Sequence, residues 1–143
     1  MCPPTLCYGA ETWPVNTHQL HTLDVVQNDC LRTIMRVRRA DHVPTADLRK
    51  HCNNQPCMPD ILRSMRLRYM GHVVRREPER YNNQLLFAKY VPGNDAQPKH
   101  SNNSIIDSYR QDLEWLGEAN ALLTKAQDRG QWRALVKQNC CLS

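Results

Sequence analysis

Residues 59–76 constrain the possible fold more than any other stretch of the chain. In this segment, PDILRSMRLRYMGHVVRR, an apolar residue recurs about every four positions, which is the spacing of one buried face of an α-helix. The stripe consists of Ile61, Met65, Tyr69 and Val73, and it is widened by Leu62, Leu67, Met70 and Val74. Pro59 suits a first helical turn, and Pro78 disfavours helical conformation in the residue before it. The spacing therefore predicts a helix over 59–76 that contacts more than one neighbour.

The remaining positions of this predicted helix are strongly cationic, and Asp60 is the one acid among them. The candidates for contact with an anion are Arg63, Arg66, Arg68, Arg75 and Arg76. The wider segment 31–80 carries twelve Lys and Arg against five Asp and Glu, whereas residues 1–30 carry three acids and no Lys or Arg. Such a basic segment indicates a polyanion partner. Supporting contacts are predicted at Arg38, Arg39, Arg49 and Lys50. The alternative is a solvated charged face on an ordinary helical protein.

Five further helices are predicted on either side of this segment. Residues 17–37 form a long helix capped by Asn16 or Thr17, because a short side-chain oxygen accepts from the free N–H groups of a first turn. Its predicted buried stripe consists of Leu20, Leu23, Val26, Cys30, Ile34 and Val37. A short helix over 46–51 and another over 81–91 follow. The predicted C-terminal pair covers 104–116, ended by Gly117, and 119–136, where Gly130 allows a break.

These elements predict an all-α protein, a small helical bundle with three parts. The parts are a helical region over 1–91, a Pro- and Asn-rich linker over 92–103, and a C-terminal helical pair with its tail over 104–143. The N-terminal residues lack a secretory signal pattern, and no stretch reaches the roughly twenty apolar residues of a membrane span. Seven cysteines, an odd number, then favour free thiols and an intracellular setting, in the nucleus or the cytoplasm.

One group of residues resembles a metal site, namely His51, Cys52 and Cys57. Zinc requires four tetrahedral ligands, usually from two closely spaced pairs, and only one Cys-x4-Cys pair is present. Free thiols in a loop are the favoured interpretation, and zinc is a weaker hypothesis. The chain also lacks a Gly-rich phosphate loop, a GxSxG sequence and an HExxH sequence. We therefore expect no catalytic residues and no cofactor.

Four sequence blocks together resemble a known family. They are YGAETW at 8–13, NDCLRTIM at 28–35, RLRYMGHVVR at 66–75 and AQDRGQWRALV at 126–136. Blocks of this kind, in this order, resemble the C-terminal portion of reverse transcriptases from non-LTR (LINE-type) retrotransposons. In that family the corresponding region is the helical thumb and tail, which follow an endonuclease and the polymerase fingers and palm. The resemblance covers about residues 6–91, and residues 104–137 more loosely.

The resemblance implies a thumb-like fold that contacts template–primer nucleic acid or element RNA. It also implies that the region is not an enzyme by itself, since the family's polymerase uses palm aspartates that bind magnesium and this chain contains no Asp-Asp pair. The expected partners are RNA or an RNA–DNA hybrid, without a membrane. A further expected partner is the missing palm. Without it, the apolar faces that would contact the palm favour self-association. The alternative hypotheses are a small helical protein-interaction module and a non-functional relic of a transposable element.

Overall fold

The computed structural model describes residues 6–77, 79–80, 105–117 and 119–140. Within these ranges all regular structure is helical, which confirms the all-α prediction. The elements are η1 (Ala10–Thr12), α2 (Thr17–Met35), η2 (Arg39–Asp41), α3 (Thr45–His51), α4 (Met58–Val74), α6 (Ile105–Leu116), α7 (Ala119–Gln127) and α8 (Arg129–Asn139). The predicted helix over 81–91 and the predicted linker over 92–103 lie outside the described residues.

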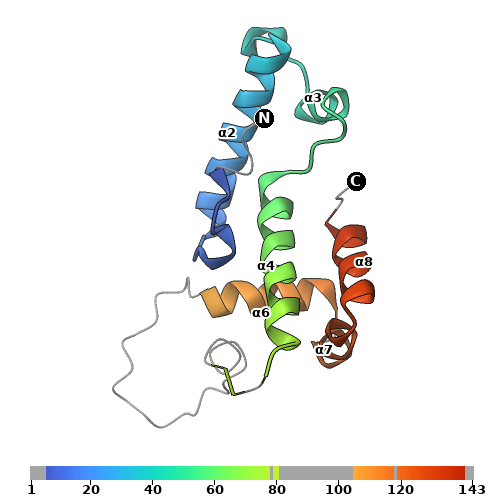
Figure 1. Cartoon of the computed structure of the whole chain (residues 1–143). Coiled ribbons are helices and arrows are strands. Elements are labelled where there is room, and N and C mark those ends of the chain that lie inside the picture. The colour runs from blue at the N-terminus through green and yellow to red at the C-terminus, as the bar shows by residue number, and fades with distance from the viewer. Residues whose placement is uncertain (1–5, 78, 81–104, 118, 141–143) are drawn as a thin grey trace, which may run out of the picture.

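Helix α4 lies at the centre of the molecule and contacts five other elements, η1, α2, α6, α7 and α8 (Figure 1). In Figure 1, η1 and α2 lie on one side of α4 and α8 on the other, while α6 crosses α4 near its C-terminal half. Helix α3 packs against α2 at the end of the molecule that lies away from α6 and α7. The C-terminal helices therefore pack directly on the helix that the sequence identified as the basic one.

Helix α4 begins at Met58, one residue before the predicted start, and ends at Val74, two residues before the predicted end. Its most buried side chains are Met58, Leu62, Leu67, Met70 and Val73, whereas Ile61, Met65 and Tyr69 of the predicted stripe are only half-buried. The reason is that α4 packs on two sides at once. Its first turns join a core cluster with η1, and its later turns join a second cluster with α6, α7 and α8.

Helix α2 has the predicted cap but only part of the predicted buried face, since Leu20 and Leu23 are half-buried and pack against the core cluster that α4 shares with η1. Asn16 accepts from the Gln19 N–H at 2.8 Å, and the Gln19 side chain accepts from the Asn16 N–H, which forms a capping box. The buried residues are Gln27 and Leu31, and the predicted core positions Val26, Cys30 and Ile34 are exposed. We name these three residues the exposed α2 face. The prediction was wrong here because α2 contacts α3 and α4 along the neighbouring line of side chains, where Gln27 also donates to the Pro56 carbonyl at 3.0 Å.

The C-terminal helices share one core cluster with α4. Its buried members are Leu67, Met70, Tyr109, Leu122, Ala126, Trp132, Val136 and Cys140. The Tyr109 hydroxyl reaches further and donates to the Glu11 carbonyl at 2.9 Å, which ties α6 to η1. The predicted break in the last helix falls at Asp128 rather than at Gly130, because the Asp128 carboxylate accepts from the N–H groups of Gly130 and Gln131 and so starts α8.

Candidate nucleic-acid interface

A basic groove runs between α4 and α8, with a volume of about 650 Å³. Its lining residues are Arg68, His72, Arg75, Arg129, Trp132, Arg133 and Lys137. Six of these seven side chains are basic, and none of the described residues that line the groove is Asp or Glu. We call this feature the α4–α8 groove.

Helical periodicity places these cations in two rows. Arg68, His72 and Arg75 are four and three residues apart on or next to α4, so they share one face of that helix. On α8, residues 129, 133 and 137 are four residues apart, so they also share one face of their helix. At a rise of about 1.5 Å per residue, the row on α8 extends about 12 Å along the groove.

The floor of the groove depends on a glycine and a tryptophan. Trp132 is 3% exposed, and its indole Nε1 donates to the Leu67 carbonyl at 2.8 Å. A Cβ atom on Gly71 would lie 2.2 Å from that Nε1, so only glycine permits this approach of the indole to the α4 backbone. Two of the sequence blocks, the one containing Gly71 and the one containing Trp132, therefore contact each other and hold the two rows in register.

The charge of the groove is largely uncompensated. Arg68, Arg129, Arg133 and Lys137 are exposed and form no hydrogen bond or ion pair with any described residue. Arg75 donates to the Ala126 carbonyl at 2.7 Å, which satisfies one N–H group without neutralising the guanidinium. Uncompensated cations gathered in a concave surface attract polyanions, because their fields add.

At the edge of the groove, Arg76 donates from Nε to His72 Nε2 at 3.0 Å. Arg76 is exposed but does not line the groove. Of the nine nucleic-acid contacts predicted from the sequence, the structure thus places Arg68 and Arg75 in the groove and Arg76 beside it. The others lie elsewhere.

Arg66 does not lie on the surface. It is 4% exposed and forms a bidentate pair with Asp112 of α6, with Nε to Oδ2 at 2.5 Å and Nη2 to Oδ1 at 3.0 Å. Because Asp112 is itself 3% exposed, it needs cationic donors to compensate for its burial. Arg66 therefore holds α6 on α4, and its guanidinium is not presented to a ligand.

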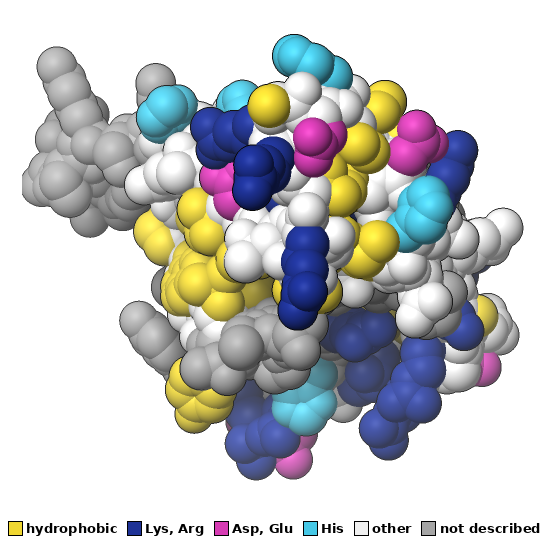
Figure 2. Space-filling model, turned by 90° about the horizontal axis from the view of Figure 1, so that it is seen from above, with side chains coloured by type: hydrophobic (Ala, Val, Ile, Leu, Met, Phe, Trp, Pro, Cys, Tyr) yellow, Lys and Arg dark blue, Asp and Glu magenta, His cyan; other side chains and the backbone are white. Residues whose placement is uncertain are grey.

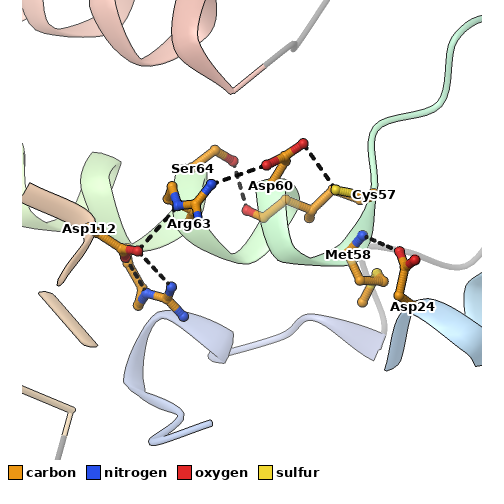
Figure 3. Close-up of polar contacts among 9 residues, drawn as sticks. Asp24, Cys57, Met58, Asp60, Arg63, Ser64 and Asp112 are labelled. Carbon is orange, nitrogen blue, oxygen red and sulfur yellow. Dashed lines mark hydrogen bonds and ion pairs between the residues drawn. The ribbon is translucent and has the colours of Figure 1, made fainter. Parts of the chain in front are cut away.

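Arg63 supports the same contact. It donates to Asp112 at 3.3 Å and to Asp60 at 3.2 Å (Figure 3). Its guanidinium also lies 4.2 Å from the centroid of the Trp115 ring. Asp60 also accepts from the Cys57 thiol at 3.0 Å. Two of the five arginines predicted on α4 thus join helices within the protein.

The supporting cations lie at the other end of the molecule, on η2 and α3 and in the residues before them. Arg39 pairs with Asp29 at 2.7 Å, and Arg49 pairs with Asp24 at 2.7 Å. Lys50 lies 3.5 Å from Asp47. Figure 2 views this end and shows Lys and Arg side chains among Asp and Glu, with hydrophobic side chains between them.

Arg38 is exposed and lies beside Arg39 in a separate hollow of about 510 Å³ at the end of α2. That hollow contains the Asp29 carboxylate. Charge at this end is therefore partly offset, unlike the charge of the α4–α8 groove.

The sequence prediction missed Arg129, Arg133 and Lys137. The available signal was their four-residue spacing, which places three cations on one face of a helix. That signal alone does not identify the neighbour of this face, and the groove forms only because α8 packs on α4.

The possible metal ligands His51, Cys52 and Cys57 do not form a metal-like group. Over the described ranges, no three His, Cys, Asp or Glu side chains are close enough to hold an ion. The His51 Nδ1 lies 2.7 Å from the Asp47 carbonyl oxygen. Burial, together with the hydrogen bond to Asp60, raises the pKa of the Cys57 thiol, which disfavours the thiolate that a metal would need.

No helix among the described residues is both long enough and apolar enough to span a membrane. Comparison of the chain with protein-family models, with curated proteins and with solved structures finds no match.

Proposed function

We propose that this chain is a nucleic-acid-binding helical module that holds the sugar–phosphate backbone in the α4–α8 groove. The observation that carries the proposal is that six basic side chains from two helices, more than 50 residues apart in sequence, line one groove, and that no carboxylate is among the described lining residues. Lys and Arg contacts to phosphates provide affinity that depends on salt and little on sequence. The groove thus supports backbone binding rather than base recognition.

The sequence resemblance supports a more specific form of the proposal. The chain would be the thumb and tail portion of a non-LTR retrotransposon reverse transcriptase, catalytically silent without the palm and endonuclease. Its ligand would be RNA or an RNA–DNA hybrid. Gly71 and Trp132 lie in two of the resembling blocks, and their contact forms the groove floor. Two of the four blocks that suggest the family therefore contribute most of the candidate interface.

The test compares two triple variants with equal changes in charge. The groove variant is Arg68→Ala/Arg133→Ala/Lys137→Ala, and the control variant removes three exposed cations outside the groove. The control carries Arg38→Ala, Lys50→Ala and Lys125→Ala. Fluorescence anisotropy of a labelled RNA–DNA hybrid between 50 and 200 mM salt measures binding. Circular dichroism checks that each variant is folded.

We expect the unmodified protein to lose affinity steeply with salt. With five permanently charged groove residues, the slope of log K against log salt reaches at most about −4.5 for a duplex, since each neutralised phosphate contributes about −0.9. In the groove variant the magnitude of this slope should fall by up to about 2.7, whereas the control variant should keep the original slope. Equal losses in the two variants, or no binding of either the hybrid or its separated RNA strand by the folded protein at low salt, would overturn the proposal.

A second candidate function is protein interaction through the exposed α2 face. Its apolar side chains Val26 and Ile34 are 47% and 59% exposed, and Cys30 lies between them on the same face. Self-association or capture of a protein partner that weakens with Val26→Ser/Ile34→Ser, but not with salt, would favour this function.

A further inference from the structure

The two rows of the α4–α8 groove lie close together. Trp132 of α8 reaches the backbone of α4, with Nε1 at 2.8 Å from the Leu67 carbonyl, and Gly71 removes the side chain that would keep the helices apart. Axes of helices packed in this way are about 8–10 Å apart. A nucleic-acid duplex is much wider, since the major groove of B-DNA alone is about 12 Å wide and admits a whole helix. A duplex can thus contact the rims of the groove but cannot enter it.

A single strand does not meet this restriction. Its backbone can run along the groove. In this position Arg68 contacts the strand from α4, and Arg129, Arg133 and Lys137 contact it from α8. A strand in this position is contacted by cations from both helices over about 12 Å of the α8 row. A duplex lying across the rims presents only its outermost phosphates to the same side chains.

Among its described lining residues, the groove presents neither an exposed aromatic ring nor an uncharged polar side chain to a base. The one aromatic lining residue, Trp132, is 3% exposed and its N–H is already bonded, so it offers neither a stacking face nor a donor. The described lining residues include no Asn, Gln, Ser or Thr, the uncharged hydrogen-bonding side chains that complement bases or a 2′-hydroxyl. The remaining lining residues are Arg, His and Lys, whose charges attract phosphates of any sequence, although Arg and Lys can also donate to guanine.

We infer that the α4–α8 groove binds one single strand of RNA or DNA through its phosphates, in preference to a duplex and with little dependence on sequence or sugar. This inference rests on the proposed function and specifies its ligand. It predicts a salt slope of at most about −3.5, because single strands release about 0.7 counterions per neutralised phosphate and the groove holds five permanent cations.

The experiment measures anisotropy of labelled single strands of about 12 nucleotides, a length within known single-strand site sizes. The probes are oligo-uridine, oligo-thymidine and a mixed sequence, with a blunt duplex of the same length as competitor. We expect the three single strands to bind within about threefold of one another and the duplex to compete at least tenfold less well. The Arg68→Ala/Arg133→Ala/Lys137→Ala variant should reduce single-strand affinity at least tenfold at 50 mM salt, and the Arg38→Ala/Lys50→Ala/Lys125→Ala control should not.

The outcomes separate the inference from the proposed function. If the duplex competes as well as the single strands, and the groove variant weakens both, the inference fails and the proposed function stands. A strong preference for one base or one sugar also overturns the inference, because it requires contacts other than those to phosphate. If neither ligand binds the folded protein at 50 mM salt, both fail.

Discussion

Replacing Gly71 by alanine tests the contact on which the groove floor rests. The new Cβ atom would lie 2.2 Å from Trp132 Nε1 and 2.3 Å from its Cδ1, closer than non-bonded atoms can approach. The rigid indole must therefore move. Because Trp132 is buried and its Nε1 donates to the Leu67 carbonyl, that movement also breaks the hydrogen bond between α8 and α4.

Three contributions set the size of the effect. Overpacking of a filled core costs about 1–3 kcal/mol. Breaking the indole hydrogen bond, which leaves a buried donor and acceptor without partners, costs about 1–3 kcal/mol. Alanine recovers about 1 kcal/mol of helix propensity relative to glycine in the interior of α4. The net loss for Gly71→Ala is thus about 1–5 kcal/mol, a large fraction of the stability of a small domain.

Urea denaturation followed by circular dichroism measures this loss, and a double-mutant cycle identifies its cause. In a Trp132→Ala background the clash is absent, so Gly71→Ala should become neutral or stabilise the protein by about 1 kcal/mol through helix propensity. The reasoning would be refuted if Gly71→Ala left the native protein as stable as before, or if it cost the same in both backgrounds.

Three further predictions concern other sites. Asp112→Ala should cost about 3–5 kcal/mol in urea denaturation, because it leaves the buried Arg66 charge unpaired; a loss of about 1 kcal/mol or less, as for an exposed pair, would contradict this. Backbone donors lower the pKa of Asp128, so its stabilisation is complete above the ordinary value of 3.8 and is lost as pH falls through the lowered value. Asp128→Asn should flatten the dependence of Tm on pH in that window, and an unchanged dependence would argue against the cap. Maleimide labelling with peptide mapping should modify exposed Cys30 before Cys140, whose pKa burial raises to about 11; the reverse order would contradict the fold.

The existence of the helices could be predicted from the sequence, but their buried faces were harder to predict. Apolar spacing and end signals located α2 and α4, and the Asn16 cap is confirmed. Within α2, however, apolar side chains are distributed around much of the helix surface. Which of them are buried therefore depends on the elements that pack against α2. Gln27 is buried there because it finds a partner in the Pro56 carbonyl, 29 residues away. Such a partner is not visible in local periodicity.

In the candidate site, too, some residues could be predicted from the local sequence, whereas the role of others depends on tertiary packing. The basic character of α4 is a local property, and the structure places two of its predicted cations, Arg68 and Arg75, in the α4–α8 groove. The role of Arg66 depends on Asp112, which lies 46 residues further along the chain, so a cation that resembled a surface residue is instead buried. The α8 half of the groove was missed for the same reason. Charge patterns identify cations, whereas only tertiary packing decides which of them face solvent.

The central position of α4 has a consequence for biosynthesis. Leu67 of α4 bonds to a tryptophan that is 65 residues further along the chain. At a synthesis rate of about 5–20 residues per second, the ribosome needs about 3–13 s to add that partner after it has made α4. During this interval the apolar side of α4 that later contacts α8 has no α8 to cover it. A chaperone or an early, non-native contact with α2 would be expected to occupy that surface in a nascent chain.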